Sequence, residues 1–193
     1  MMEKNRLEAF SDGVLAIIIT IMVLELEKPA GDKFADLMQL WPTLMTYFLS
    51  FLFVATYWVN HHMLFQKAER INVKILWCNI AWLFVMSLIP FITNWVGSYP
   101  TSQMPLMFYF ADMALGTLIF HLMFYLIAIE LGQKETFRLS ARNYVSMATY
   151  IVVAVLASFS PILAYIIAAA VTCWWIIPEK KPEKKNKEIA NPS

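Results

Sequence analysis

The sequence predicts an all-α integral membrane protein with six transmembrane helices, and three features of the chain predict it. Of the 193 residues, 60% are hydrophobic and only 15% are charged, whereas in soluble domains about 25% are charged. The apolar residues form six long stretches separated by short links. Positive charges concentrate in alternate links, as they do in membrane proteins. We therefore expect one membrane domain at residues 1–177 and a cytoplasmic tail without stable structure at residues 178–193.

The first apolar segment, at the start of the chain, is the most informative. Residues 13–24 carry no charge, but they are too few to span a bilayer, which takes about 20 residues. A helix from Ala9 to Leu26 is long enough, and it places Asp12 at or inside the membrane edge. A carboxylate at this depth is costly and faces protein or a water-filled cavity. We therefore expect Asp12 to have partners on neighbouring helices.

One face of this first helix is smooth and almost wholly apolar. At about 100° per residue, Ser11 and Asp12 point away from that face, and Thr20 supplies its one hydroxyl. Taken alone, such a stripe is more typical of packing against a protein core than of a functional surface. The stripe consists of Phe10, Gly13, Ile17, Thr20, Ile21 and Leu24, and Arg6 extends it towards the N-terminus.

Five further apolar segments follow in order. A turn punctuated by Pro29 and Gly31 separates the first from the second. In the third segment we expect a kink at Pro90, because proline removes a backbone donor. The five segments cover residues 36–65, 73–97, 106–131, 141–159 and 161–177.

The positions of Lys and Arg predict the orientation of these segments. If the N-terminus is cytoplasmic, 13 of the 15 Lys and Arg residues lie at cytoplasmic ends, and only Lys28 and Lys33 lie in outer loops. An excess of positive charge marks the cytoplasmic side of a membrane protein. We therefore expect a multi-pass protein of the cell membrane with both termini in the cytoplasm.

Several polar side chains lie near the predicted cytoplasmic ends of the first three segments. His61 is followed by a second histidine, but neighbours diverge by about 100° on a helix, whereas a two-histidine metal site needs one face. Because Trp58 shares a face with His61, we expect a hydrogen-bonded histidine packed on tryptophan, with a ligand or proton-relay role as the alternative. Asn79 is expected to bond across helices. Together with Ser11 and Asp12, these residues are predicted to form one polar cluster that locks helix packing.

The chain carries no enzyme signature. Its five glycines are scattered and form no phosphate-binding loop, and no H-E-x-x-H occurs. No serine, histidine and aspartate are spaced as a catalytic cluster. The formal net charge of +1 provides no basic field for nucleic acid. We therefore expect neither an enzyme nor a nucleic-acid-binding protein, and no resident metal or cofactor.

Three short motifs resemble a known family. Residues 6–12 contain R-x-x-x-F-S-D, which is similar to the signature of the transmembrane protein 175 type potassium channels in their short prokaryotic form. The sequence Y-W-V-N-H-H at residues 57–62 resembles the second helix of that family. The sequence C-N-I-A-W-L at residues 78–83 resembles the third. The resemblance is strong over the first half of the chain and rests mainly on hydropathy in the second.

The resemblance implies a homotetramer of six-helix subunits, with the first helices lining a central pore that is permeable to potassium. It implies a channel without a carbonyl filter loop, and the chain contains no T-V-G-Y-G. By position, Ile17, Ile21 and Leu24 would form apolar pore rings and Thr20 a hydroxyl layer, with potassium ions passing near Ile17 and Thr20. The supporting network would comprise Arg6, Phe10, Ser11, Asp12, Trp58, His61 and Asn79.

These observations lead to one main functional hypothesis and two alternatives. The main hypothesis is a potassium-permeable cation channel, closed where an apolar ring excludes water and ions. The first alternative is a proton-coupled carrier or proton pathway that uses Asp12 and His61. The second is a membrane scaffold without transport. The expected partners are the lipid bilayer, three further copies of the chain, and potassium and other monovalent cations.

Overall fold

The structure is a computed structural model that describes residues 3–68, 70–132, 141–157 and 159–176. The predicted tail at residues 178–193 and most of the link before residue 141 lie outside the described residues. All regular structure in the described ranges is helical. The helices are α1 (Lys4–Leu24), α2 (Phe34–Gln39), α3 (Trp41–Lys67), α4 (Val73–Met86), α5 (Ile89–Ser98), α6 (Gln103–Glu130), α7 (Ala141–Leu156) and α8 (Pro161–Ile176).

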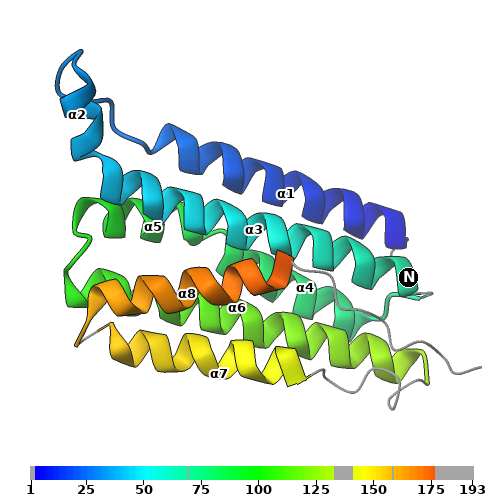
Figure 1. Cartoon of the computed structure of the whole chain (residues 1–193). Helices are drawn as coiled ribbons and strands as arrows, with labels where there is room; N and C mark the ends of the chain where they lie inside the picture. The colour runs from blue at the N-terminus through cyan, green and yellow to red at the C-terminus, as the bar shows by residue number, and fades with distance from the viewer. Residues whose placement is uncertain (1–2, 69, 133–140, 158, 177–193) are drawn as a thin grey trace, which may run out of the picture.

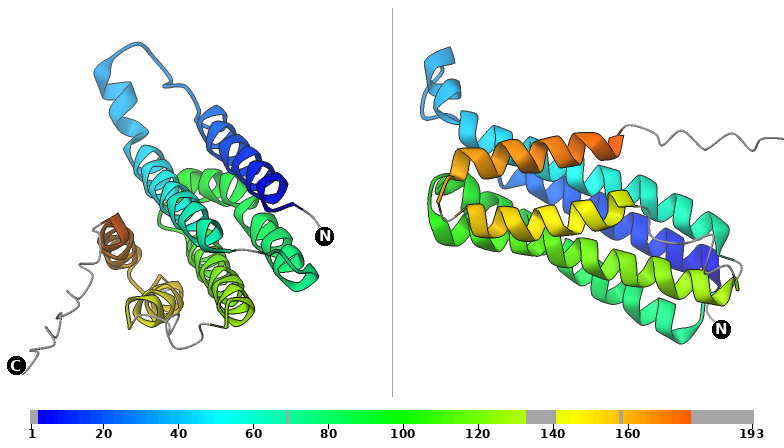
Figure 2. Two further views of the ribbon diagram at one scale, coloured as in Figure 1. Left: turned by 90° about the vertical axis from the view of Figure 1, so that its right-hand side faces the viewer. Right: turned by 60° about the horizontal axis from the view of Figure 1, so that its bottom comes forward.

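The long helices run alongside one another as a bundle (Figure 1). Helix α3 contacts α1, α5 and α8, and helix α6 contacts α4, α5 and α7. Helix α1 packs on α3, α4 and α5, and it lies at one edge of the bundle, whereas α7 and α8 lie at the opposite edge (Figure 2). One flank of α1 is therefore left without cover from the described part of its own subunit.

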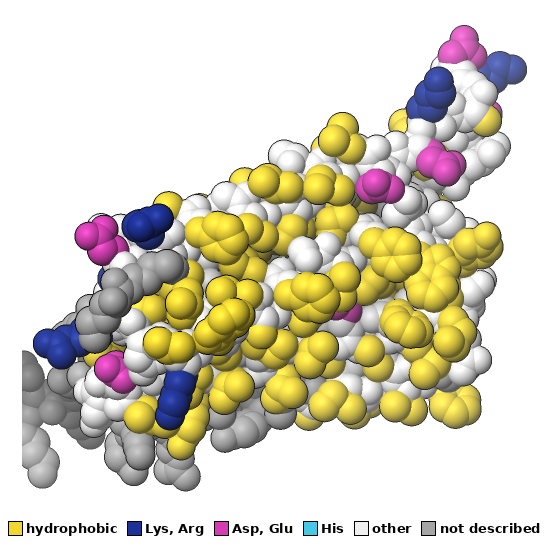
Figure 3. All heavy atoms as spheres, turned by 180° about the vertical axis from the view of Figure 1, so that it is seen from behind, with side chains coloured by type: hydrophobic (Ala, Val, Ile, Leu, Met, Phe, Trp, Pro, Cys, Tyr) yellow, Lys and Arg dark blue, Asp and Glu magenta, His cyan; other side chains and the backbone are white. Residues whose placement is uncertain are grey.

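The apolar surface of this bundle suits a lipid bilayer. Hydrophobic side chains cover the middle of the face in Figure 3, and most charged side chains gather towards its two ends. Among the described residues, four helical stretches are long and apolar enough to cross a membrane: α1, α3, α6 and the pair α4–α5 taken together as Val73–Ser98. Helices α7 and α8 have 16 residues each, or about 24 Å at 1.5 Å per residue, which is less than the bilayer core of about 30 Å.

Two prolines divide segments that the apolar pattern predicts as continuous. The third segment breaks between Met86 and Ile89, because Pro90 lacks the N–H that would bond to the carbonyl of Met86. The kink expected at Pro90 therefore occurs in the turn before it. The second segment does not begin at residue 36 as one helix: α2 ends at Gln39, and α3 starts afresh with Pro42 in its first turn, where proline is tolerated.

Buried hydroxyl groups join α3, α5 and α6 in the half of the bundle nearer α2. Ser50 Oγ donates to the carbonyl of Thr46 at 2.9 Å, so it can only accept from its other two partners. These are Thr93 Oγ1 at 2.8 Å and the hydroxyl of Tyr109 at 2.9 Å. No lipid group replaces such partners in a bilayer core. The two bonds from Thr93 and Tyr109 to Ser50 therefore fix the position of α3 relative to α5 and α6.

Gly97 marks a close approach between α5 and α3. A Cβ atom on Gly97 would lie 2.8 Å from Thr43 Cγ2, and Thr43 Oγ1 donates to the carbonyl of Gly97 at 3.0 Å. We expect Gly97→Ala to push the two helices apart and to lower the free energy of unfolding by about 1–3 kcal/mol. Gly116→Ala is the matched control, since its Cβ would meet no atom closer than 3.7 Å. Thermal unfolding in detergent measures both, and equal Tm values would contradict the close approach.

Candidate functional site

The predicted stripe on α1 faces away from the rest of the subunit. The buried residues of α1 recur every three or four positions on the opposite side: Leu7, Ser11, Leu15, Ile18 and Met22. Along the stripe, the exposed fractions are 58% for Ile17, 40% for Ile21 and 80% for Leu24. The interpretation of the stripe as packing within the subunit's own core is therefore wrong. It is an unpartnered apolar surface at the edge of the bundle.

A groove of about 390 Å³ runs beside the stripe, between α1 and the break that separates α4 from α5. Ile17 and Ile21 form one wall, and Ser87 and Phe91 belong to the other. The break between α4 and α5 carries the wall opposite α1, since Ser87, Pro90 and Phe91 line the groove there. The two isoleucines therefore border open space on this side of the helix.

A buried chain of hydrogen bonds joins α1 to α4 and α3. Ser11 Oγ donates to the carbonyl of Leu7 at 2.8 Å, so it must accept from Asn79 Nδ2, which lies 2.9 Å away. The remaining amide oxygen, Asn79 Oδ1, lies 2.8 Å from His61 Nε2, and that nitrogen must therefore carry the hydrogen. Ser11, Asn79 and His61 are all fully buried. One arrangement of hydrogens thus satisfies the whole chain.

The ring of His61 is enclosed by two aromatic rings. It stacks on Trp82 with centroids 5.1 Å apart and on Phe65 with centroids 4.3 Å apart. The prediction that His61 packs on a tryptophan named the wrong one: Trp82 on α4, not Trp58, provides the stacking surface. Within the described ranges, Nδ1 of His61 has no hydrogen-bond partner. The described residues also contain no cluster of metal-ligating side chains.

Asp12 belongs to a separate contact. Its Oδ1 accepts from Trp58 Nε1 at 2.9 Å, and the tryptophan is 46% exposed. The polar residues of the first three predicted segments therefore form two sets instead of one cluster. The Ser11 set ties α1 to α4 and α3 in the interior, and Asp12 ties α1 to α3 near the surface.

Arg6 and Phe10, the other two residues of the predicted network, form no hydrogen bond with either set. Both side chains are exposed, and Phe10 is 56% accessible. In the part of the chain that the structure describes, neither has a hydrogen bond, an ion pair or a ring contact. Both lie on the flank of α1 that carries the stripe. Any role for them in the network needs a partner outside the described residues.

Sequence reasoning missed a set of contacts that holds the start of α1 against the end of α3. Glu8 Oε1 lies 3.5 Å from His62 Nδ1. Gln66 Nε2 lies 2.9 Å from His62 Nε2, and Lys4 Nζ donates to the carbonyl of Gln66 at 3.3 Å. A signal was present, because Lys4 and Glu8 are four residues apart, as are His62 and Gln66, and such pairs share a helix face.

Comparison with known proteins gives three consistent results. A model of the family described as endosomal/lysosomal potassium channel TMEM175 matches residues 6–90. A potassium channel of Chryseobacterium sp. (strain P1-3) is 39% identical over 191 residues, which cover 97% of this chain and 100% of that protein. The endosomal/lysosomal proton channel TMEM175 of Homo sapiens is 37% identical over 84 residues, which cover 36% of this chain and 17% of that protein.

The fold has a counterpart among solved structures. The crystal structure of a lysosomal potassium-selective channel TMEM175 homolog from Chamaesiphon minutus matches with a TM-score of 0.79, covering 90% of this chain and 96% of that one at 24% identity. The family match runs from Arg6 to Pro90 and so contains α3, α4 and all but the first two residues of α1, with both hydrogen-bonded sets. The relationship to the chryseobacterial protein extends over the full length of both chains. This chain therefore belongs to the TMEM175 family.

Proposed function

We propose that the chain is one subunit of a homotetrameric, potassium-permeable cation channel whose four α1 helices surround a central pore. The observation that carries this proposal is the 39% identity, over 97% of the chain, to a protein named as a potassium channel. Potassium is then the permeant ion, and the protein transports ions rather than catalysing a reaction. The resemblance of residues 6–12 to the signature of such channels supports the same conclusion.

The position of α1 supports its role as the pore helix. One subunit carries one copy of the stripe, so a pore along it requires several subunits around an axis, as in a closed cyclic oligomer. The stripe lies at the uncovered edge of the bundle and exposes Ile17, Ile21 and Leu24. Four such edges meeting at an axis bury these side chains against one another as stacked rings. The same assembly covers an apolar surface that the subunit leaves open.

The ring of Ile17 is the proposed gate. Four apolar side chains at a narrow axis exclude ions, because an ion there sheds water and finds no ligand to replace it. The groove beside α1 gives the gate room to open, since Ile17 and Ile21 border it directly. A rotation of α1 that turns Ile17 from the axis into this groove widens the pore without a clash on that side.

Thr20 is the proposed selectivity layer. Its Oγ1 donates to the carbonyl of Ile17 at 2.9 Å, so the hydroxyl hydrogen is committed within the helix. The oxygen then offers only lone pairs to its surroundings. Four such oxygens around the axis provide partial replacement for the water that a cation loses. A layer of acceptors without free donors favours cations over anions.

The proposed topology has six spans and cytoplasmic termini. Helices α7 and α8 run side by side along the bundle (Figure 1), and exposed apolar residues such as Ile151, Val155 and Ile166 suit contact with lipid. The ends at which α1 starts and α3 stops carry Lys4 and Lys67, which favours the cytoplasmic side for that end of the bundle. We place the protein in the cell membrane on the same grounds.

A proton pathway through Asp12 and His61 is the competing function, and the proton channel among the relatives is the observation in its favour. The geometry argues against these two residues as its relay. Asp12 and His61 belong to separate hydrogen-bonded sets. The chain that starts at His61 ends on the carbonyl of Leu7, which has no proton to pass on. Protons that permeate this protein are therefore expected to use the pore.

The test uses the purified full-length protein. Native mass spectrometry in mild detergent is expected to give four chains per particle, and planar-bilayer recording is expected to give single-channel potassium currents larger than sodium currents. The same recording under a proton gradient, with Asp12→Asn beside the wild type, separates the two functions. If the protein shows saturable, proton-linked flux and Asp12→Asn abolishes it, the channel hypothesis is wrong and the proton-coupled carrier is favoured. A monomer that conducts would exclude a pore built from α1.

A further inference from the structure

Asp112 on α6 is the one buried acidic residue of the described chain. It is 9% exposed, whereas the other acidic residues in the described ranges are half-buried or exposed. Helix α6 begins at Gln103 and is long and apolar enough to cross a membrane, and Asp112 lies about 14 Å along its axis at 1.5 Å per residue. The carboxyl group therefore lies inside a membrane span, and it has no part in the candidate site on α1.

Asp112 has no polar partner among the described residues, since it forms no hydrogen bond and no ion pair there. Other carboxylates of the chain do contact a donor. They are Glu8 with His62, Asp12 with Trp58, Glu25 with Asn94, Asp36 with the N–H of Lys33, and Glu130 with Asn72. Asp112 thus differs from them both in its burial and in its isolation.

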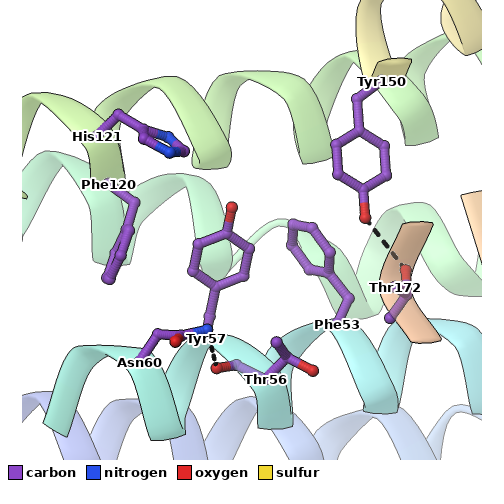
Figure 4. A pocket seen from close by; sticks show the side chains of 8 residues that line it. All are labelled: Phe53, Thr56, Tyr57, Asn60, Phe120, His121, Tyr150 and Thr172. Carbon is purple, nitrogen blue, oxygen red and sulfur yellow. Dashed lines mark hydrogen bonds between the residues drawn. The ribbon is translucent and has the colours of Figure 1, made fainter. Parts of the chain in front are cut away.

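Polar side chains packed along other parts of α6 do have partners. The hydroxyl of Tyr57 on α3 donates to Thr117 Oγ1 of α6 at 2.7 Å. In the close-up of Figure 4, Tyr150 of α7 is hydrogen-bonded to Thr172 of α8. The isolation of Asp112 is therefore a feature of its own position and not of the whole helix.

The side chains on either side of Asp112 along α6 pack against α4 and α5. Residues four apart share a helix face, so Asp112 lies between Phe108 and Gly116 on one side of α6. Phe108 contacts Trp95 of α5, with ring centroids 5.7 Å apart. A Cβ atom on Gly116 would lie 3.7 Å from Met86 Sδ at the end of α4. Asp112 is therefore level with the break between α4 and α5, among apolar neighbours.

In the described helices α4, α5 and α7, which pack on α6, no basic residue lies level with Asp112. Helix α5 contains neither acidic nor basic residues. The basic residues of the other two, Lys74 and Arg142, are each the second residue of their helix. Lys74 is thus at the far end of α4 from the break, and Arg142 starts the helix that runs back along α6 from its end (Figure 1). Tyr109, one turn before Asp112, donates its hydroxyl hydrogen to Ser50.

We propose that Asp112 is an uncharged carboxylic acid in the membrane interior, and so a proton-binding site of the subunit outside the proposed pore. Burial of an ionised carboxylate without a partner costs far more free energy than burial of the neutral acid, so such a group keeps its proton. Ionisable groups in a membrane otherwise pair with one another or face a water-filled cavity. The proposal requires only that α6 crosses the membrane, so it holds or fails independently of the pore.

A protonated carboxyl group in apolar surroundings is also a modification site for lipid-soluble carbodiimides. The carboxyl oxygen adds to the central carbon of the N=C=N group, and the acid proton moves to one of the nitrogens, which gives an O-acylisourea. The acyl group then moves from that oxygen to the nitrogen and gives a stable N-acylurea. No atom leaves and no oxidant takes part, so the modified residue gains the mass of one carbodiimide.

Labelling of the full-length protein in liposomes at neutral pH tests the proposal. Dicyclohexylcarbodiimide, which partitions into lipid, should modify the peptide that contains Asp112 to a greater extent than any other peptide, as measured by mass spectrometry. A water-soluble carbodiimide should instead modify exposed carboxyl groups such as those of Glu27 and Asp32. Adducts of the lipid-soluble reagent on these exposed groups, with none on Asp112, would overturn the proposal.

Two variants provide the matched comparison. Asp112→Asn should lose the adduct and should keep the Tm of the wild type, because a neutral amide replaces a neutral acid of the same size and no bond is lost. Asp12→Asn is the control, since Asp12 is bonded to Trp58, and it should leave the adduct on Asp112 unchanged. A clear loss of Tm in Asp112→Asn would reveal an ionic partner outside the described residues and would overturn the proposal.

Infrared spectroscopy gives a second measurement on the unlabelled protein. The difference spectrum between the wild type and Asp112→Asn at neutral pH should contain the C=O stretching band of a protonated carboxyl group. The two bands of an ionised carboxylate in its place would overturn the proposal. If the variant fails to fold, the labelling of the wild-type protein still decides, because it compares carboxyl groups within one molecule.

Discussion

Replacement of Ile17 by asparagine is expected to raise the basal potassium current by about tenfold or more. Four asparagine side chains at the proposed ring hold water and supply ligands for an ion, so the closed pore no longer dewets. A shift of about 1.4 kcal/mol towards the wetted state suffices for a tenfold change. Discrimination between potassium and sodium should fall at the same time. Single-channel and macroscopic currents in bilayers, at matched protein density, measure both effects.

Val23→Asn is the control for this experiment. Val23 is 48% exposed, close to the 58% of Ile17, but at 100° per residue it lies about 120° around the helix. The same polar group there should leave the gate closed. Thr20→Ala should also keep the gate closed and should weaken selectivity, because it removes only the hydroxyl layer. Equal currents from Ile17→Asn and Val23→Asn would show that the pore does not follow the stripe.

Asn79→Leu is expected to be the most destabilising exchange in the support of α1. Leucine has a similar size, but it removes the acceptor of His61 Nε2 and the donor to Ser11 Oγ. The N–H of His61 is then left buried without a partner, which costs about 1–3 kcal/mol. The variant should show a lower Tm and a lower yield of the oligomer, because α1 loses its interior tie to α4 and α3. Thermal unfolding and size-exclusion chromatography measure the two effects.

Two further substitutions provide reference values for the loss in Tm expected of Asn79→Leu. Asn94→Leu removes the bond that Asn94 Nδ2 donates to Glu25 Oε2 at 2.7 Å, between exposed groups that water can satisfy, and should leave Tm nearly unchanged. Asp12→Ala removes one bond to Trp58, and hydrogen bonds between membrane helices average about 0.6 kcal/mol. Its effect should lie between the other two. A larger loss from Asp12→Ala than from Asn79→Leu would assign the main support of α1 to Asp12.

The helical segments could be predicted because the signals for them are local. A run of apolar residues long enough for a bilayer predicts a helix wherever the chain later places it, and the described helices fall within or close to the predicted segments. The divided segments were the exception. Pro42 and Pro90 were both visible, but the apolar pattern runs through them, and a proline restricts only the backbone of its own turn.

The contacts between helices were less accessible to sequence reasoning. Trp58 lies three residues from His61, and Trp82 lies three residues from Asn79, so the sequence does not distinguish between them. Trp82 stacks on His61 because α4 packs close to α3. Trp58 donates its hydrogen bond to Asp12 because α3 packs on α1. For the same reason the single predicted cluster became two sets. Helical periodicity defines which side chains share a face, but not which helix covers that face.

The sequence by itself determined that this protein is helical, embedded in a membrane and a member of the TMEM175 family, and it defined the apolar stripe of α1. Only the tertiary structure decided that this stripe is uncovered within the subunit, because that depends on where α3, α4 and α5 pack around α1. It also decided which hydroxyls bond to one another, as Ser50 and Tyr109 are separated by 59 residues. Such pairs form because a membrane interior leaves each polar group to find its partner within the protein.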